Sequence, residues 1–412
     1  MLSKILKPYF QIEKIVLQFI AAEFFIQLVN ASFMMILNIY LSKKGYEDHQ
    51  IADFISLRFL TVMLLAFPLG LFIKGRNLKP LFYIAAIGVF VFSIGILLAA
   101  EFKRIDMIYF SAALWGMCYG IVQVLALPFI IRNASEKTKT AAISLSYATY
   151  SLAMILAGII IFVLNHFNPL YFDEFKCLLL LALLSGISIY FVFKMQQKEV
   201  IPAFEGSRLS LSGFDWGTIA FAMTPSLLLA IGAGLTIPFI NLFFFKVFKM
   251  ESDNFALLNS FSSITVAGAA LLVPHVRAKY GYKIAITRTQ SIAVISLALL
   301  ACTEFYATFE YSLYFAIFFF LIRQPLMNMA APVSSELVMQ YVGPKNQEII
   351  SALTASIWSG SWFFSALIFS VLRKNGFAYA NVFLITAGIY AIAVLWYHFL
   401  IKAHLAKEQI KN

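Results

Sequence analysis

The chain has 412 residues, of which 61% are hydrophobic and only 12% are charged, and its formal net charge is +11. A water-soluble protein of this composition would need one very large apolar core with almost no polar surface, so the soluble class is excluded. The excess positive charge suits a membrane with anionic headgroups and needs no nucleic-acid partner.

Apolar stretches long enough to cross a bilayer recur along the whole chain. A helix needs about 20 apolar residues to cross a hydrocarbon layer of about 30 Å. Strands of membrane barrels are shorter and alternate in polarity, so these stretches predict helices. The predicted spans are residues 15–41, 51–73, 79–100, 107–131, 140–165, 175–194, 217–245, 254–276, 284–303, 311–339, 348–372 and 377–401.

The loops between these spans alternate in their content of Lys and Arg. The N-terminal segment, the even-numbered loops and the C-terminal tail carry nineteen of these residues, and the opposite side carries nine. Because cytoplasmic loops are enriched in Lys and Arg, both termini are predicted to be cytoplasmic. The first apolar run is as long as a full span and has no small-residue cleavage site, so we expect it to stay as the first helix.

One polar segment divides the chain into two halves. Residues 196–215 are predicted to form a cytoplasmic linker between an N-terminal six-helix bundle (1–195) and a C-terminal one (216–412). At an offset of 204 residues, Pro128 aligns with Pro332 and Tyr119 with Arg323. Parallel six-helix repeats of this kind are the architecture of one large transporter superfamily.

The loop after the second span carries the most recognisable motif. It reads Gly70-Leu71-Phe72-Ile73-Lys74-Gly75-Arg76-Asn77-Leu78-Lys79. This resembles the loop of the major facilitator superfamily, in which Gly, three residues, Asp, Arg, any residue and Gly precede two basic residues. Lys74 stands at the position of the family's acid, so the acid–Arg latch is missing. The resemblance implies that Lys74, Arg76 and Lys79 lie at an inner gate, and a plain topogenic charge without a gating role is the alternative.

Two further stretches resemble a bacterial efflux-permease branch of the superfamily. They are Gly232 to Asn241 in the seventh span and Arg323 to Met329 in the tenth. The resemblance implies an all-α membrane protein of 12 transmembrane helices in two pseudo-symmetric six-helix bundles, in the inner membrane of a bacterium. It also implies that the first, fourth, seventh and tenth helices surround a central cavity.

Polar residues follow a single face of the first predicted helix. Glu23, Gln27, Asn30, Met34 and Asn38 are spaced by 4, 3, 4 and 4 residues. Such a face either lines a cavity or forms a seam whose amides bond neighbouring helices. We expect Gln27 and Asn30 to contact a substrate.

An aromatic stripe marks the fourth span, and a cation marks the tenth. Trp115, Tyr119 and Gln123 repeat every four residues, which indicates either packing or a substrate route. Arg323 lies midway along the tenth span and needs a partner, which is Glu23, an anionic substrate group or backbone carbonyls. Asn328 on the same helix extends this polar site.

Asn241 and three charged residues complete the candidate set. Asn241 follows Pro238, where a broken helix would free backbone groups for a ligand. Glu23 is the candidate for proton coupling, and a permanently ionised structural carboxylate is the alternative. Arg58 is expected at an outer gate or in a pair with Asp53.

These features predict a secondary active transporter of a small organic solute. The cargo is expected to be anionic, zwitterionic or amphiphilic, with movement by alternating access and proton coupling. A facilitated-diffusion uniporter and a transporter-like receptor are the alternatives. No enzyme is expected, because the five His residues fall in loops or at helix ends without a catalytic cluster. The spacing of the three Cys residues suggests no metal site, and no cofactor is expected. The predicted partners are the lipid bilayer, the solute and protons, and the chain is expected to be a monomer.

Overall fold

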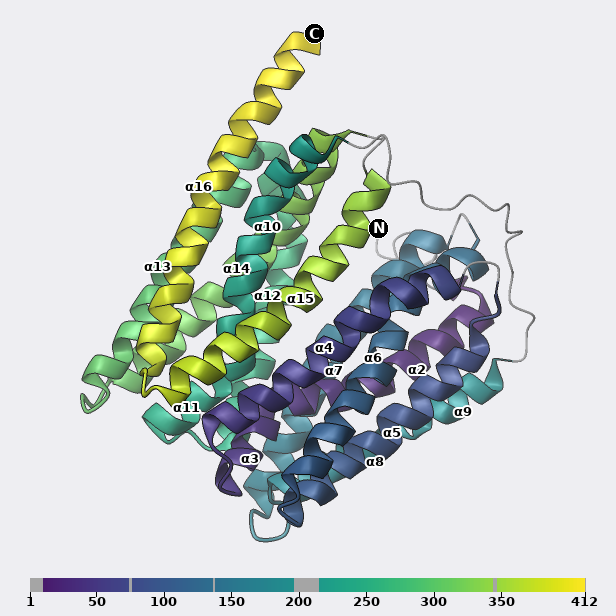
Figure 1. The fold of residues 1–412 in the computed structure, drawn as a ribbon, viewed down its shortest axis with the longest axis vertical. Helices are drawn as coiled ribbons and strands as arrows, with labels where there is room; N and C mark the ends of the chain where they lie inside the picture. Colours follow the sequence, from purple (N-terminus) through teal and green to yellow (C-terminus); the bar gives the residue numbers. More distant parts are fainter. Residues whose placement is uncertain (1–9, 74–75, 136–137, 196–214, 344–346, 412) are drawn as a thin grey trace. The chain divides into compact units, whose positions relative to one another are not determined.

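The computed structural model describes residues 10–73, 76–135, 138–195, 215–343 and 347–411. All regular secondary structure in these ranges is helical. Figure 1 traces the elements from α2 in purple to α16 in yellow. Within the described residues, ten helices are long and apolar enough to cross a membrane.

The elements from the N-terminus to the predicted linker occupy the first six predicted spans. They are α2 (Lys14–Ser32), η1 (Phe33–Leu37), α3 (Asn38–Lys43), α4 (Asp48–Phe72), α5 (Lys79–Glu101), α6 (Ile105–Asn133), α7 (Lys139–Phe167), α8 (Glu174–Ser185) and α9 (Ile187–Lys194). The first span is therefore α2, η1 and α3 in sequence, and the sixth is α8 followed by α9.

The elements after the linker occupy the other six predicted spans. They are α10 (Trp216–Thr236), η2 (Ile237–Phe239), α11 (Ile240–Phe248), α12 (Ser252–Tyr282), η3 (Lys283–Arg288), α13 (Thr289–Cys302), η4 (Thr303–Tyr306), α14 (Ser312–Val342), α15 (Gln347–Lys374) and α16 (Tyr379–Lys411). The all-α membrane fold predicted from the sequence is confirmed.

The contacts divide the chain into two compact units. The first comprises Met1–Glu47, Leu57–Gly206 and Glu251–Ser260, and the second Asp48–Ser56, Ser207–Met250 and Phe261–Asn412. The division into bundles 1–195 and 216–412 stays a prediction, and the predicted linker lies outside the described residues apart from Asp215.

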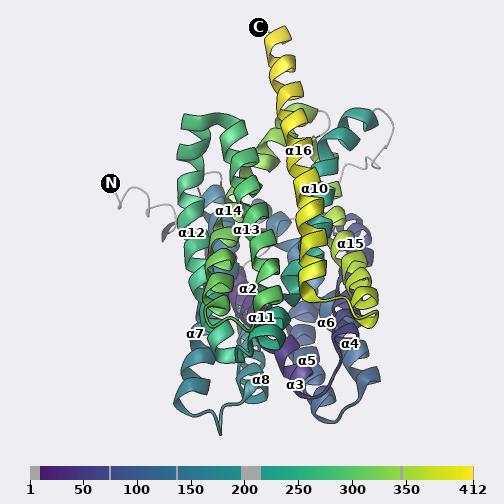
Figure 2. The same cartoon turned by 90° about the vertical axis from the view of Figure 1, so that its left-hand side faces the viewer.

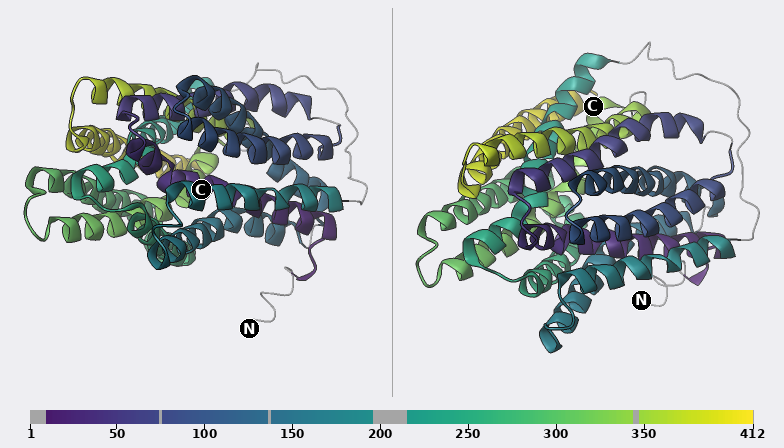
Figure 3. Two further views of the ribbon diagram at one scale, coloured as in Figure 1. Left: turned by 90° about the horizontal axis from the view of Figure 1, so that it is seen from below. Right: turned by 60° about the horizontal axis from the view of Figure 1, so that its bottom comes forward.

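In the first unit, α2 is a central packing element. It contacts α7, α8 and α9, while α5 packs along α6. The purple and blue helices run alongside one another in Figure 1 and in both views of Figure 3. Three buried rings join α2, α5 and α6: Phe19 lies 4.8 Å from Phe82 and 5.0 Å from Phe129, centroid to centroid. Their burial stabilises the helix contacts near this end of the unit.

In the second unit, glycines let α10 approach α15 and α16 closely. A Cβ atom on Gly232 would lie 2.5 Å from the Tyr390 ring, and one on Gly234 would lie 2.7 Å from Ser365. The Ser365 hydroxyl donates a hydrogen bond to the carbonyl of Ile231 at 2.8 Å. Figure 2 shows that α16 extends beyond the ends of α10 and α15.

Two spans are interrupted close to predicted site residues. A π-helical stretch, η1, separates α2 from α3, and a 3₁₀ turn containing Pro238, η2, separates α10 from α11. The break predicted at Pro238 is confirmed. Because π-helical and 3₁₀ stretches change the direction of side chains, both interruptions locally re-aim polar groups.

Candidate functional site

The site in the first unit depends on a close approach of α4 to α6. A Cβ atom on Gly116 would lie 2.5 Å from the carbonyl oxygen of Arg58 and 2.6 Å from the hydroxyl of Thr61. Only glycine fits this contact without a shift of the neighbouring backbone. The approach brings Arg58 of α4 directly against the aromatic side chains of α6.

Arg58 lies in a cage of aromatic and amide groups. Its guanidinium carbon is 4.2 Å from the Trp115 ring centroid, and its Nη2 donates to Asn30 Oδ1 at 2.5 Å. Its Nη1 is 3.7 Å from the sulfur of Met34 in η1. The residue is 7% exposed, and its Nε has no hydrogen-bond partner in the described part of the chain. Among the described residues no carboxylate pairs with it, so the cage holds an uncompensated positive charge.

The sequence left two roles open for Arg58, one at an outer gate and one in a pair with Asp53, and the guanidinium makes its described contacts with other groups. Residues five apart on a helix point about 140° away from each other, which separates the two side chains. The guanidinium instead contacts Asn30 and Trp115, two residues predicted to bind substrate. Arg58 therefore belongs with that group, while Asp53 is tied into α4 through its carbonyl, which accepts from Ser56 at 2.8 Å.

Predicted residues of α2 and α6 meet beside this cage. The Tyr119 hydroxyl donates to Gln27 Oε1 at 3.0 Å, and Asn30 Nδ2 donates to the same oxygen at 3.2 Å. The rings of Trp115 and Tyr119 stack with centroids 5.1 Å apart and planes 9° from parallel. The structure thus brings together four of the predicted substrate residues with Arg58.

Glu23 and Gln123 lie in the wall of an adjoining cavity of about 220 Å³. Gln27, Ser146, Tyr147 and Tyr150 also line it. Glu23 is 6% exposed and accepts a hydrogen bond from the Ser146 hydroxyl at 2.6 Å. No cation of the described chain pairs with the Glu23 carboxyl. Gln27 therefore links the cavity to the Arg58 cage.

The second unit holds its own buried guanidinium on α14. Arg323 is 1% exposed, and its Nη1 donates to Gln324 Oε1 at 2.8 Å. The Tyr390 hydroxyl lies close enough to interact with it electrostatically. Within the described residues its Nε has no hydrogen-bond partner, and it takes part in no ion pair. The Gln324 amide and the Tyr390 hydroxyl are its neighbours in this unit, and the partner expected from the sequence, which is Glu23, an anionic substrate group or backbone carbonyls, stays a prediction.

Two predicted asparagines lie in the same unit. Asn241 is buried at the start of α11, and its Oδ1 accepts from the backbone N–H of Leu242 at 2.8 Å. Asn328 is exposed, and its amide donates to the carbonyl of Gln324, one turn earlier on α14, at 2.8 Å. The Asn328 amide is thus bonded to the backbone of its own helix, whereas the Gln324 side chain is the hydrogen-bond partner of Arg323.

The basic residues expected at an inner gate make local contacts where they are described. Lys79 donates from Nζ to the carbonyl of Met195 at 2.6 Å, and Arg76 lies over the ring of Phe72 at 3.9 Å. Lys74 lies outside the described residues. Arg132, which sequence reasoning missed, donates to the carbonyls of Ile73 and Arg76, at 3.1 Å each.

Ser146 and Asp48 are two other polar residues that sequence reasoning missed. Ser146 is the hydrogen-bond partner of Glu23, and because Ser144, Thr149 and Ser151 lie close to it in the same span, the sequence does not single it out. Asp48 accepts from Arg373 Nε at 3.0 Å and from the Tyr379 hydroxyl at 2.5 Å within the second unit. These partners are far apart in the sequence, so no spacing could have revealed them. No group of residues suited to a metal ion occurs among the described residues.

Comparisons with known proteins agree with this architecture. A family model described as Major Facilitator Superfamily matches residues 19–366. The structure resembles the nucleoside transporter NupG, with 16% identity and a TM-score of 0.71 over 95% of this chain and 100% of that chain. It also resembles a bacterial homologue of the iron transporter ferroportin in the inward-facing state, with 12% identity and a TM-score of 0.73 over 95% of this chain and 98% of that chain.

A D-xylose-proton symporter is a third similar structure, with 14% identity and a TM-score of 0.70 over 94% of this chain and 96% of that chain. No curated protein matches the sequence. At these identities the structural likeness shows the fold alone.

Proposed function

The chain belongs to the Major Facilitator Superfamily and is an integral, multi-pass membrane protein of the secondary transporter class. From this premise we propose that it moves a small organic solute with an anionic group. The movement is alternating access coupled to protons, in a bacterial inner membrane with both termini cytoplasmic. The proposal applies to the monomeric chain.

The observation that carries the proposal is the Arg58 cage. A buried charge in a membrane-spanning helix is costly, and such residues mark substrate or ion pathways. Arg58 has no carboxylate partner among the described residues, and its Nε is free. An anionic group of the solute would neutralise the guanidinium in a planar, two-point contact, for which Arg is well suited.

The aromatic and amide groups around Arg58 favour an organic rather than an inorganic anion. Trp115 and Tyr119 offer stacked rings, and Gln27 and Asn30 offer amides that can exchange partners. The nearby cavity of about 220 Å³ suits a small molecule. Arg323 of the second unit, which also lacks a carboxylate partner among the described residues, is a second candidate for binding the anionic group.

Proton coupling is assigned to Glu23. Its carboxyl lies in the cavity wall, and within the described residues it has a hydroxyl partner, Ser146, and no cation. A carboxyl can bind and release a proton, and no cation among the described residues holds this one in its charged form. Binding and release of that proton can therefore accompany movement of the solute.

The experiment is a stability screen followed by a flux measurement. Purified protein is heated with a panel of organic anions, zwitterions and neutral solutes, because a bound ligand raises the apparent melting temperature by mass action. We expect organic anions to stabilise the protein and to enter proteoliposomes that contain it. Stabilisation by neutral solutes alone contradicts the anionic class, and binding without flux contradicts transport.

Arg58→Lys tests the site in the same screen. The substitution keeps the charge but removes the flat group that lies over Trp115. We expect an about tenfold or larger loss of affinity for the stabilising anion. Arg288→Lys, at an exposed position, is the matched control and should leave affinity unchanged. An equal loss in both variants would remove Arg58 from the site.

A further inference from the structure

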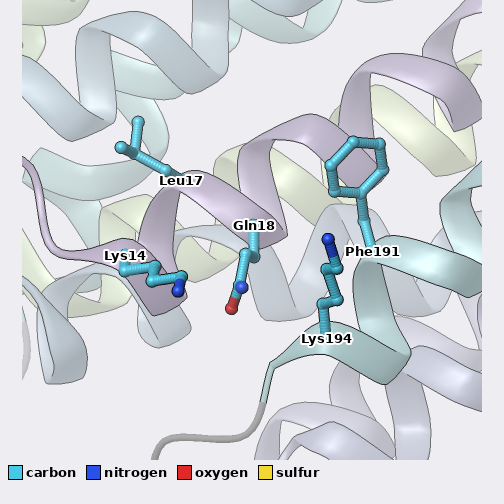
Figure 4. A pocket seen from close by; sticks show the side chains of 5 residues that line it. All are labelled: Lys14, Leu17, Gln18, Phe191 and Lys194. Atoms are coloured by element: carbon cyan, nitrogen blue, oxygen red, sulfur yellow. The ribbon is translucent and has the colours of Figure 1, made fainter.

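A second cleft of the first unit lies where α2 begins and α9 ends. Figure 4 shows the side chains that line it: Lys14, Leu17, Gln18, Phe191 and Lys194. Its volume is about 340 Å³. It shares no lining residue with the cavity that contains Glu23. The transport site therefore leaves this cleft without a role.

The cleft carries two positive charges that no acid of the described chain neutralises. Neither Lys14 nor Lys194 takes part in an ion pair of the described residues, and the ammonium of Lys194 lies over the Tyr190 ring at 4.6 Å. Glu13 precedes Lys14, but its carboxylate accepts from the Ser135 backbone N–H at 2.9 Å and from the Thr138 hydroxyl at 2.7 Å. An anion entering the cleft meets two cations and the amide of Gln18.

The order of residues along the two helices follows the order of groups in a phospholipid. Lys14 is the first residue of one membrane span and Lys194 is the last of another, so both lie at a boundary. Leu17 and Phe191 lie three residues further into the spans and form the apolar part of the cleft. Exposed apolar side chains continue along α8 and α9, namely Leu183, Tyr190 and Phe193. A charged rim above an apolar surface is typical of contact with lipid.

We propose that this cleft binds the headgroup of an acidic phospholipid. The phosphate lies between the ammonium groups of Lys14 and Lys194, and the Gln18 amide donates to a headgroup oxygen. The first carbons of an acyl chain contact Leu17 and Phe191. A free phosphate ion would use only the polar rim, so the apolar wall and the exposed side chains along α9 assign the site to a lipid.

The experiment is a titration of the purified full-length protein with phosphatidylglycerol, followed by native mass spectrometry of bound lipid. Two lysines are removed in Lys14→Gln/Lys194→Gln. We expect the tightest phosphatidylglycerol site to weaken about 30-fold, because each lysine near an anionic headgroup contributes about a fivefold factor. Phosphatidylcholine should not fill this site in the unsubstituted protein.

The matched control is Lys176→Gln/Lys374→Gln. It removes the same charge from two other lysines, one of which lies over the Tyr171 ring at 4.7 Å, much as Lys194 lies over Tyr190. The control should keep the tight site. Equal affinity in both double variants, or equal binding of phosphatidylcholine, overturns the proposal.

Two further arms separate a lipid from a free anion. Excess inorganic phosphate should leave phosphatidylglycerol bound, and Phe191→Ala should weaken the lipid while both lysines remain. Displacement by phosphate, or no effect of Phe191→Ala, assigns the cleft to small anions and contradicts a lipid site. Melting temperatures without lipid verify that every variant is folded.

Discussion

Arg58 shows how a full charge is accommodated in a membrane-spanning helix without a carboxylate. The guanidinium face lies 4.2 Å from the Trp115 ring and one Nη donates to Asn30. A cation over an aromatic face is worth about 2 kcal/mol or more once water is excluded. This is less than a buried charge costs, so the cage leaves the residue ready for an additional anionic partner.

The position of Arg58 depends on the missing side chain of Gly116. We expect Gly116→Ala to lower the unfolding free energy by about 1–3 kcal/mol, because the new methyl group would force α4 away from α6. The apparent melting temperature of the purified protein measures this, and weaker stabilisation by the transported anion should accompany it.

Gly388→Ala is the control for Gly116→Ala. Nothing lies within 4 Å of the added methyl group on α16. Its effect should be neutral or stabilising by up to about 1 kcal/mol, as for an ordinary helix interior. Equal destabilisation by both substitutions would show that the contact with Arg58 is not the cause.

At the scale of elements, the first span is divided into α2, η1 and α3, and its first two segments contribute different groups to the site. The α2 segment carries Glu23 and Gln27, and the π-helical η1 brings Met34 to Arg58 and stacks Phe33 on Trp115 at 5.6 Å. Such π-helical stretches are frequent at functional sites because they re-aim side chains. The polar stripe of this span was predicted from its spacing, but the π-helical stretch was not, since it leaves no mark in the polarity pattern.

The start of α2 is fixed by Glu13, which lies just outside the span. Burial raises the pKa of its carboxyl, but hydrogen bonds from Thr138 and Ser135 outweigh this and hold the pKa below its ordinary value of 4.5. A lowered folded-state pKa means that the stabilisation is present above the unfolded-state value and is lost as the pH falls through the folded-state value.

We therefore expect Glu13→Gln to lower the melting temperature at neutral pH and to have no effect once the pH is below the folded-state pKa of Glu13. Melting curves of both proteins across an acidic series measure the difference. Thr138→Val should add little in the Glu13→Gln background, because its partner is already altered. A difference that persists at low pH contradicts a charge-dependent contact.

At the scale of the whole molecule, the chain belongs to a transporter superfamily, so a substitution of Glu23 tests whether solute movement is coupled to protons. We expect Glu23→Gln to abolish uptake driven by a pH gradient in proteoliposomes, whereas exchange of solute across the membrane survives. The amide keeps the size of the side chain and cannot carry the proton. Glu310→Gln, at an exposed position outside the described helices, should leave both activities intact.

Two results would contradict this role of Glu23. Loss of both activities in a folded variant means that Glu23 acts in binding or structure. Unchanged uptake driven by the gradient means that another residue carries the proton, whereas a protein that shows no gradient-driven uptake before substitution is a uniporter. Counterflow measured on the same vesicles separates these cases.

The fold followed from the sequence because a bilayer permits few solutions. Long apolar runs must become helices to satisfy their backbone groups, and helices occupy every predicted span. Most of their ends lie within a few residues of the prediction, whereas α16 continues to Lys411, beyond the predicted end at residue 401. The period of the helix similarly put Trp115 with Tyr119 and Gln27 with Asn30 on common faces. Both pairs make contact in the structure.

Only the tertiary structure decided which of these faces meet and which cations complete them. For Arg58 the sequence left an outer gate and a pair with Asp53 open, and the approach of α4 to α6 at Gly116 brings its guanidinium to Trp115. Ser146 opposite Glu23 and Lys194 beside Lys14 come from helices distant in the sequence. Periodicity describes one helix at a time, whereas a site needs the rotation and spacing of several, and these are determined by side-chain packing.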